Sequence, residues 1–267
     1  MRDIAIRSLS GILYVFLIVG AAWVSQTLFL SVISIFSGLA LLEYQRLQKV
    51  TSPLPYLFLM LLWVQSVFHF LPNLITALLL PIVVGINLYL AFALFQSPNR
   101  VFSKQFSLLG AFFYLAGSSY FILALTHIEP ELGVGPVLFV YASIWVNNSF
   151  AYLVGRLFGK TPLFPSISPK KTWEGFFGGL VFTLLLSYYI AVQQTDFSIA
   201  YLLLMGSLIA IFATVGDLVQ SKFKRLAAVK DSGSLIPGHG GFFDRMDSVL
   251  FSAPLVYAIY LIFSYVS

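Results

Sequence analysis

The charged side chains of this 267-residue chain gather in one short segment near its C-terminal end. The whole chain has 15 Lys and Arg and 10 Asp and Glu residues, and nine of these lie between Gly216 and Ser248. Charges of both signs at this density, beside long apolar sequence, favour a site for a polyphosphate and a divalent cation over a packing role. The nine are Asp217, Asp231, Asp244, Asp247, Lys222, Lys224, Arg225, Lys230 and Arg245.

The aspartates of this segment have a spacing that suits a magnesium site. Asp217 ends an apolar run, where a carboxylate is costly unless it has a partner or a metal. Asp244 and Asp247 are three residues apart, so on a helix they lie on one face and can hold Mg²⁺ together with water and phosphate oxygens. The alternative for this pair is a helix start, where the helix dipole favours aspartate.

A turn-forming run precedes the aspartate pair, and it reads Pro237-Gly238-His239-Gly240-Gly241. Glycine lets a backbone approach a ligand closely, so we expect these glycines to line a phosphate site. His239 is equally well explained as a turn residue and as a proton carrier.

A second polar segment lies upstream, and it has the features of an anion site. Lys170 and Lys171 follow Ser168 and its neighbouring proline, a sequence typical of a helix N-cap whose free N–H groups bind anions. Asn147 and Asn148 are adjacent amides that can donate to phosphate or offer oxygen to a cation. The alternatives are a basic flank at the membrane surface for the lysines and helix-to-helix hydrogen bonding for the amides.

The rest of the chain is apolar, with 59% hydrophobic and only 9% charged residues. This composition predicts an all-α polytopic membrane protein. Nine runs are long enough, or nearly so, to cross about 30 Å of hydrocarbon as helices, although short polar breaks leave eight as the alternative. They are 5–24, 27–42, 54–71, 74–95, 106–127, 134–154, 175–193, 198–217 and 249–266.

The basic residues predict how these spans are oriented. Lys and Arg stay on the cytoplasmic side of short loops, and with nine spans all 15 fall on one side. The opposite turns carry Glu129, Glu131 and Asp196 instead. We therefore expect a cytoplasmic N-terminus, a C-terminus outside the membrane and a polar site facing the cytoplasm. Eight spans would spoil this separation.

One integral membrane domain is the simplest organisation of residues 1–267. Residues 1–127 are expected to be mainly scaffold spans, while 145–248 carries the site. The chain has no cysteine, which excludes disulfides, thiolate nucleophiles and cysteine metal sites. Its net charge of +5 is spread along one membrane face without a soluble binding module, so we expect membrane lipids as partners and no nucleic acid.

The segment from Ser221 to Asp247 resembles the signature of phosphatidate cytidylyltransferases, also called CDP-diacylglycerol synthases. It reads S-K-F-K-R-x4-K-D-x-G-x-L-I-P-G-H-G-G-F-F-D-R-M-D. Gly216-Asp217-Leu218 and the run 168–175 are similar to other blocks of the same family. The resemblance is strong over 145–248 and rests on hydropathy alone before that.

The resemblance implies that CTP and phosphatidic acid react to give CDP-diacylglycerol and pyrophosphate, with Mg²⁺ and a second cation for which the family suggests K⁺. In-line attack on the α-phosphorus needs positioning and charge neutralisation more than a covalent nucleophile. The expected metal ligands are Asp217, Asp244, Asp247 and Asn148. The residues expected around the phosphates are Lys222, Arg225, Lys230, Arg245, Lys170, Lys171, Ser221, Asn147, Gly238, His239, Gly240 and Gly241. Asp231 is expected to be a further catalytic residue.

One position departs from the family pattern. Where the family has Asn-Asp or Ala-Asp before Ala-Tyr, this chain has Asn147-Asn148 before Ala151-Tyr152. A neutral amide in place of a carboxylate predicts weaker cation binding, or one bound ion fewer.

Two other functions fit part of the sequence. A CTP-dependent lipid kinase, or a cytidylyltransferase for another lipid phosphate, would keep the nucleotide site and change the lipid groove. A transporter of an anionic solute would also place polar residues in spans, but the polar groups gather on one face and no inverted repeat is visible. The family further suggests a homodimer, and the compact chain fits a bacterial plasma (inner) membrane.

Overall fold

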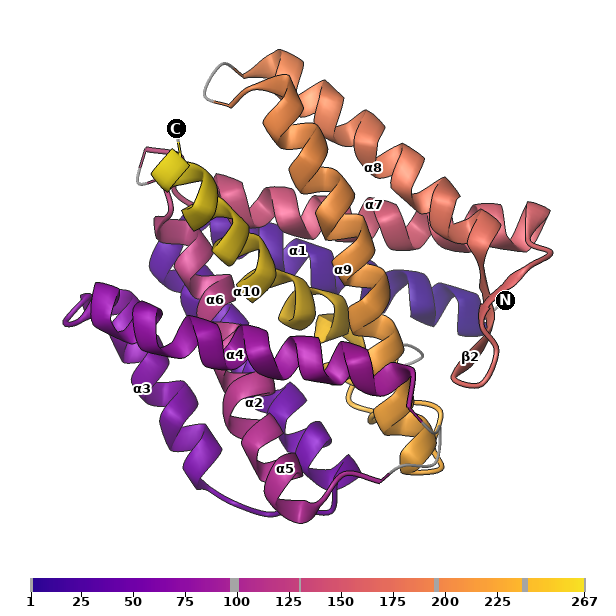
Figure 1. The fold of residues 1–267 in the computed structure, drawn as a ribbon, viewed down its shortest axis with the longest axis horizontal. Coiled ribbons are helices and arrows are strands. Elements are labelled where there is room, and N and C mark those ends of the chain that lie inside the picture. The colour runs from indigo at the N-terminus through magenta and orange to yellow at the C-terminus, as the bar shows by residue number, and fades with distance from the viewer. Residues whose placement is uncertain (1, 97–100, 130, 195–196, 237–239, 267) are drawn as a thin grey trace.

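The computed structural model describes residues 2–96, 101–129, 131–194, 197–236 and 240–266. Within these ranges nine helical rods follow one another along the chain (Figure 1). The fifth rod is composite and contains a π-helical and a 3-10 segment. The elements are α1 Arg2–Val24, α2 Gln26–Leu47, α3 Leu54–Phe68, α4 Pro72–Leu94, α5 Lys104–Leu109, η1 Gly110–Gly117, α6 Ser118–Ala124, η2 Leu125–His127, α7 Gly135–Phe158, α8 Trp173–Gln193, α9 Ile199–Leu226 and α10 Phe243–Val266.

Seven of the described helices are long and apolar enough to cross a membrane. Two further apolar segments, Ser10–Val24 and Leu54–Phe68, are shorter than the rest. The predicted class, a nearly all-α polytopic membrane protein, is confirmed. The exact number of crossings, nine by sequence, stays a prediction.

The two chain ends lie at opposite ends of the molecule (Figure 1). The last turns of α10 lie at the α6–α7 turn, where the Tyr260 hydroxyl donates to Glu129 Oε1 at 2.6 Å. The end of α9 lies at the opposite end, where Arg225 Nε donates to Ile167 O at 3.3 Å. The acidic turn and this basic region are therefore separated in space, as the charge pattern predicts.

A short antiparallel hairpin departs from the all-helical expectation. It pairs β1 Pro162–Phe164 with β2 Ser168–Thr172. The predicted helix N-cap at Ser168 is wrong, because that residue begins a strand. A residue before proline avoids the helical region, so Ser168 and Pro169 favour extended backbone here.

The N-cap of helix α8 lies four residues after the predicted cap position. Thr172 is its N-cap, and its hydroxyl accepts a hydrogen bond from Gly175 N at 3.1 Å. Glu174, in the first turn, accepts from the N–H groups of Lys160 and Thr161 at 3.1 and 3.2 Å. These bonds close the hairpin against the helix and fix the direction of β2.

Small residues, among them Gly175 and Gly179, let α7 and α8 approach closely. A Cβ added at Gly175 would lie 2.6 Å from Ala151 O, and one at Gly179 would lie 2.6 Å from Asn147 O. The hairpin joins these two closely packed helices, and its strand β2 contacts both of them.

Helix α9 continues nine residues beyond the predicted end at 217, to Leu226. Because the extension is helical, Asp217, Ser221 and Lys224 fall on one face at spacings of four and three. Lys222 and Phe223 point elsewhere and are buried. The helical extension therefore decides which charged residues face one another.

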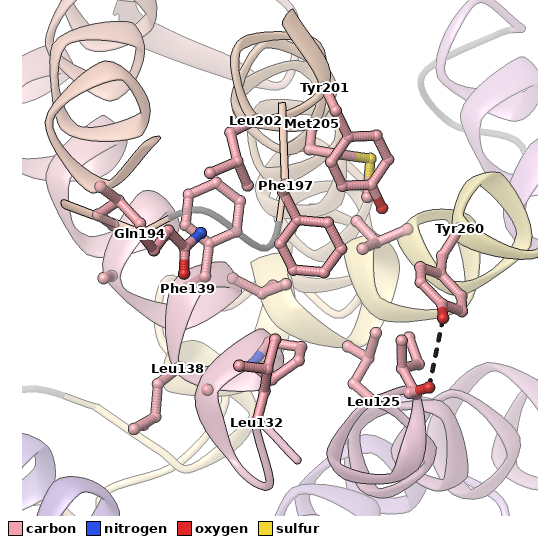
Figure 2. A pocket seen from close by; sticks show the side chains of 17 residues that line it. Leu125, Leu132, Leu138, Phe139, Gln194, Phe197, Tyr201, Leu202, Met205 and Tyr260 are labelled. Atoms are coloured by element: carbon pink, nitrogen blue, oxygen red, sulfur yellow. Dashed lines mark hydrogen bonds between the residues drawn. The ribbon is translucent and has the colours of Figure 1, made fainter. Parts of the chain in front are cut away.

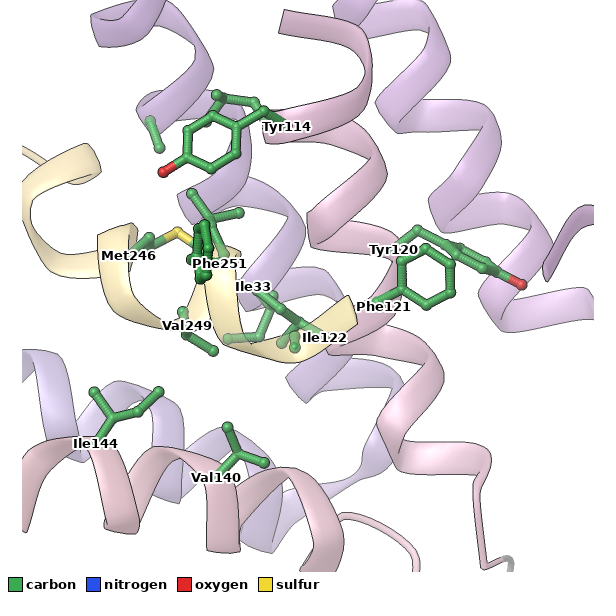
Figure 3. Close-up of a cluster of buried hydrophobic side chains, with 14 of the residues drawn as sticks. Ile33, Tyr114, Tyr120, Phe121, Ile122, Val140, Ile144, Met246, Val249 and Phe251 are labelled. Carbon is green, nitrogen blue, oxygen red and sulfur yellow. The ribbon is translucent and has the colours of Figure 1, made fainter. Parts of the chain in front are cut away.

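The core lies where α2, α6, α7 and α10 meet (Figure 3). α10 supplies Met246, Val249 and Phe251, each at most 2% exposed, against Phe121 of α6 and Val140 of α7. In a membrane such packing acts through close van der Waals contact. Since Met246 is fixed in this core, the first turn of α10 is fixed as well, together with Arg245 and Asp247 on either side of Met246.

Candidate active site

A polar cavity of about 650 Å³ opens between α7, the hairpin, α9 and α10. Its wall combines the two polar segments that the sequence singles out. The predicted site residues that line it are Asn147, Asn148, Lys170, Lys171, Asp217, Asp231, Asp244, Arg245 and Asp247. The fold thus brings together residues from positions 147 to 247.

Asp217 lies on the α9 side of the cavity with a cation in contact. Lys171 Nζ, from β2, is 2.6 Å from Asp217 Oδ2, and the two side chains are 26% and 29% exposed. The Ser221 hydroxyl, one turn along α9, donates to Asp217 Oδ1 at 3.2 Å. Asp217 is therefore oriented by its own helix and held close to a basic strand.

Asp244, in the first turn of α10, is the most fully bonded carboxylate of the cavity. Lys224 Nζ lies 2.7 Å from its Oδ1, and Gln220 Nε2 donates to the same oxygen at 3.0 Å. Its Oδ2 accepts from the backbone N–H groups of Ser232 and Gly241 at 2.8 and 3.0 Å. Ser232 and Gly241, from two described parts of the loop before α10, therefore both hold this carboxylate.

Asp247 of α10 and the two asparagines of α7 lie on facing walls of the cavity, and Asn148 connects the two helices through Ser248. Asp247 is 8% exposed and accepts from Ser248 N at 2.5 Å. Asn148 Nδ2 donates to Ser248 Oγ at 3.4 Å, and Asn147 Nδ2 donates to Asn148 Oδ1 at 3.3 Å. Asn148 therefore makes the helix-to-helix bond that was one alternative, while Asn147 bonds its neighbour on α7, and both amides also line the cavity.

Three of the basic residues predicted around the phosphates do not line the cavity, and neither does Ser221, which bonds Asp217. Lys222 is 3% exposed and donates to Ala93 O at the end of α4, so the expectation that it faces the phosphates is corrected. Arg225 Nε donates to Ile167 O and so braces the hairpin. Lys230 is exposed on the loop after α9. The helical continuation of α9 to Leu226, which hydropathy does not indicate, turns Lys222 away from the cavity and Lys224 toward it.

The structure adds three basic or aromatic residues to the predicted site. Lys224 lines the cavity and pairs with Asp244. Tyr152 and Arg156 line it from α7, with Arg156 Nη1 3.5 Å from the Tyr152 hydroxyl. Tyr152 and Arg156 lie four and eight residues after Asn148 on the same helix. Helical periodicity was therefore the signal that could have identified these two residues.

The glycine run is only partly described. Gly238 and His239 lie outside the described residues, so their predicted roles stay predictions. Gly240 has a positive φ of 83°, and a Cβ there would lie 2.6 Å from Asp244 Oδ2. Gly240 and Gly241 therefore wrap Asp244 and do not line the cavity themselves.

Comparison with known proteins identifies the family of the chain. The chain matches the model of the cytidylyltransferase family over residues 5–263. It belongs to this family. It is 32% identical to the phosphatidate cytidylyltransferase of Bacillus subtilis, over 99% of this chain and 100% of the relative. It is 37% identical to that of Aquifex aeolicus over 73% and 72% of the two chains, and 41% identical to that of Staphylococcus saprophyticus over 58% and 62%. The resemblance predicted from the signature is confirmed.

This cytidylyltransferase-family chain has a second cavity, of about 350 Å³, at the other end of the helices (Figure 2). It lies between the α6–α7 turn, the start of α9 and the end of α10. The side chains around it are mostly apolar, such as Phe139, Phe197 and Met205. Among the described residues that line it, none is Lys, Arg, Asp or Glu. A triphosphate needs cationic partners, so the polar cavity is the better nucleotide site.

The donor set of the polar cavity fits a hard divalent cation, since it offers carboxylate and amide oxygens and no sulfur. The ammonium groups of Lys171 and Lys224 take the place of a metal ion beside Asp217 and Asp244, since each carboxylate already holds a cation at contact distance. Within the described part of the chain, no three Asp, Glu or His side chains converge into a ready metal shell. A divalent ion would therefore displace a lysine and complete its shell with water and phosphate oxygens.

Proposed function

We propose that this protein transfers the cytidylyl group of CTP to phosphatidic acid, giving CDP-diacylglycerol and pyrophosphate for phospholipid biosynthesis. One observation carries the proposal. The chain belongs to the cytidylyltransferase family, and its aspartates and basic side chains meet in a single cavity at one end of the membrane helices. Relatives that are named phosphatidate cytidylyltransferase support the choice of lipid substrate.

The reaction needs positioning and charge neutralisation. A phosphatidate oxygen attacks the α-phosphorus of CTP, the bond from that phosphorus to the oxygen bridging the β-phosphorus breaks, and pyrophosphate leaves with that oxygen. No covalent intermediate with the protein is required. Lys171 and Lys224 can exchange their aspartate partners for phosphate oxygens as CTP enters, and Arg156, Lys170 and Arg245 add positive charge around the same space.

Exchange of lysines from aspartate to phosphate would leave Asp217 and Asp244 free to hold a cation. We propose that Mg²⁺ is held by these two carboxylates, with Asp247 and Asn148 as further ligands. When bound, it would neutralise charge on the phosphates and on the leaving pyrophosphate. A second cation, K⁺, belongs to the same proposal.

The setting of the enzyme is also proposed. The basic residues favour an active site on the cytoplasmic face, an N-terminus on that side and a C-terminus outside. The bacterial relatives favour a bacterial plasma membrane. A homodimer stays a prediction, and the mass of the protein in detergent, measured by light scattering, would check it.

The position of a label separates the proposed reaction from its alternatives. Purified protein is incubated with phosphatidic acid and CTP labelled at the α- or the γ-phosphate. The transferase moves α-label into lipid and releases γ-label as pyrophosphate. A lipid kinase would move γ-label into lipid, and a transporter would leave both labels in CTP. Either of these last two results would contradict the proposed function.

Asn148 gives a prediction about the metal. Asn148→Asp adds a carboxylate to the cavity wall, so the Mg²⁺ concentration for half-maximal activity is expected to fall severalfold, up to about tenfold. The measurement is a Mg²⁺ titration of cytidylyl transfer, with Asn148→Ala as the control for loss of the bond to Ser248. Unchanged activity and unchanged Mg²⁺ dependence in the aspartate variant would remove Asn148 from the metal site.

A further inference from the structure

A buried carboxylate from the N-terminal half of the chain lies behind the active-site loop. Glu43, on α2, is 1% exposed and does not line the cavity. Its Oε1 accepts from Phe242 N at 3.2 Å, and its Oε2 accepts from Phe243 N at 2.9 Å. The Ser232 hydroxyl is 2.8 Å from the same Oε2. Glu43 thus caps the start of α10 from another helix, where a negative charge also suits the helix dipole.

Two glycines of the signature leave room for this carboxylate. A Cβ added at Gly241 or at Gly233 would collide with the Glu43 carboxylate oxygens. These glycines are therefore explained by the approach of Glu43, whereas the sequence suggested approach to a phosphate for Gly241. The described residues on both sides of this loop, 232–233 and 241–243, therefore pack around a side chain of α2.

Ser232 links Glu43 to the active site. Its hydroxyl lies 2.8 Å from Glu43 Oε2 and 2.9 Å from Asp244 Oδ2, and its backbone N–H donates to Asp244. Gly241 N donates to the same Asp244 oxygen. The loop that binds Glu43 on one side therefore binds Asp244 on the other, and Asp244 in turn holds Lys224 on the cavity wall.

We propose that Glu43 is a positioning residue for cytidylyl transfer, which fixes Ser232 and residues 241–243 so that Asp244 and Lys224 keep their places. The inference rests on the proposed function for its catalytic part. Glu43 acts through backbone amides and Ser232, without contact with a substrate in the cavity. Its two oxygens serve separate N–H donors, so both must be acceptors.

Glu43→Gln tests this requirement with little change of shape. A glutamine has one acceptor oxygen, so its NH₂ group would face either Phe242 N or Phe243 N, donor against donor. Losing a bond to a charged acceptor should speed amide exchange at Ser232 and at 241–243 by roughly tenfold to a hundredfold. We expect kcat to fall by a similar factor, while the KM for CTP changes less than about threefold.

Gln45→Ala is the matched control. Gln45 lies on the same helix, is 6% exposed and bonds Ser52 on the turn to α3, away from the loop. It is expected to change thermal stability without selective exchange at 241–243 and without the fall in kcat. If Glu43→Gln does not fold, Ser232→Ala decides instead, because it removes only the hydroxyl between the two carboxylates. A severalfold lower kcat supports the proposal, and an unchanged kcat overturns it.

The results also separate this inference from the proposed function. Active wild type, together with a Glu43→Gln variant unchanged in exchange and in kcat, overturns the role of Glu43 alone. Wild type that moves no α-label into lipid overturns the proposed function. Fast exchange at 241–243 in the Glu43→Gln variant would then still support Glu43 as the residue that fixes the loop.

Discussion

Replacing Asp217 by Asn is expected to lower the rate of cytidylyl transfer by about a hundredfold to a thousandfold. The carboxylate lies on the cavity wall, 2.6 Å from Lys171, and it is a proposed ligand of the metal that neutralises the reacting phosphates. Asparagine keeps the shape of the side chain and removes its charge. The loss should therefore appear in kcat of a folded protein.

The measurement is transfer of α-label from CTP to lipid by detergent-purified variants, with thermal unfolding to establish that each is folded. Glu129→Gln is the control, because Glu129 is also an acidic residue at a helix turn but lies at the other end of the molecule, bonded by Tyr260. It should keep activity within about twofold. An Asp217→Asn protein that retains more than about a tenth of wild-type activity would remove Asp217 from the reaction.

Two neighbouring lysines are expected to differ sharply in their effect on catalysis. Lys224→Met should lower kcat/KM for CTP by about a hundredfold, because Lys224 lines the cavity and carries one of its positive charges. Lys222→Met should lower it by less than about tenfold, because Lys222 is buried and donates to Ala93 O.

Steady-state kinetics measures this difference directly. The two variants carry the same substitution, lysine to methionine, at positions two residues apart. Far-ultraviolet circular dichroism and thermal unfolding show whether each variant is folded before rates are compared. The opposite order, with Lys222→Met the more damaging of two folded proteins, would mean that α9 presents another face to CTP.

Hydropathy and local motifs predicted most of the fold. The apolar runs match the helices, and the charge pattern agrees with the separation of Glu129 from the basic end. Hairpin and helix boundaries were harder to predict. Ser168 and Thr172 are both good cap residues, and only the pairing with β1 and the bond from Gly175 decide between them. No helix stop signal lies between 217 and Leu226, and hydropathy alone placed the end of α9 nine residues too early.

The signature predicted which residues share a site, but not how each one acts. Asp217, Asp244 and Asp247 do line one cavity, since they are close in the motif and lie on adjacent helices. Glu43 could not be found in this way, because its bond to Phe242 spans 199 positions and nothing local marks it. Buried carboxylates that act through a distant loop need the tertiary structure to be recognised.

The most direct test of the central claim is to map where CTP binds. Purified protein is cross-linked with a photoreactive CTP analogue in the presence of Mg²⁺, and the modified peptides are identified by mass spectrometry. We predict labels within 147–176 and 214–247, which unlabelled CTP displaces. Displaceable labels confined to the apolar cavity, within 125–142 and 194–205, would contradict the assignment of the active site.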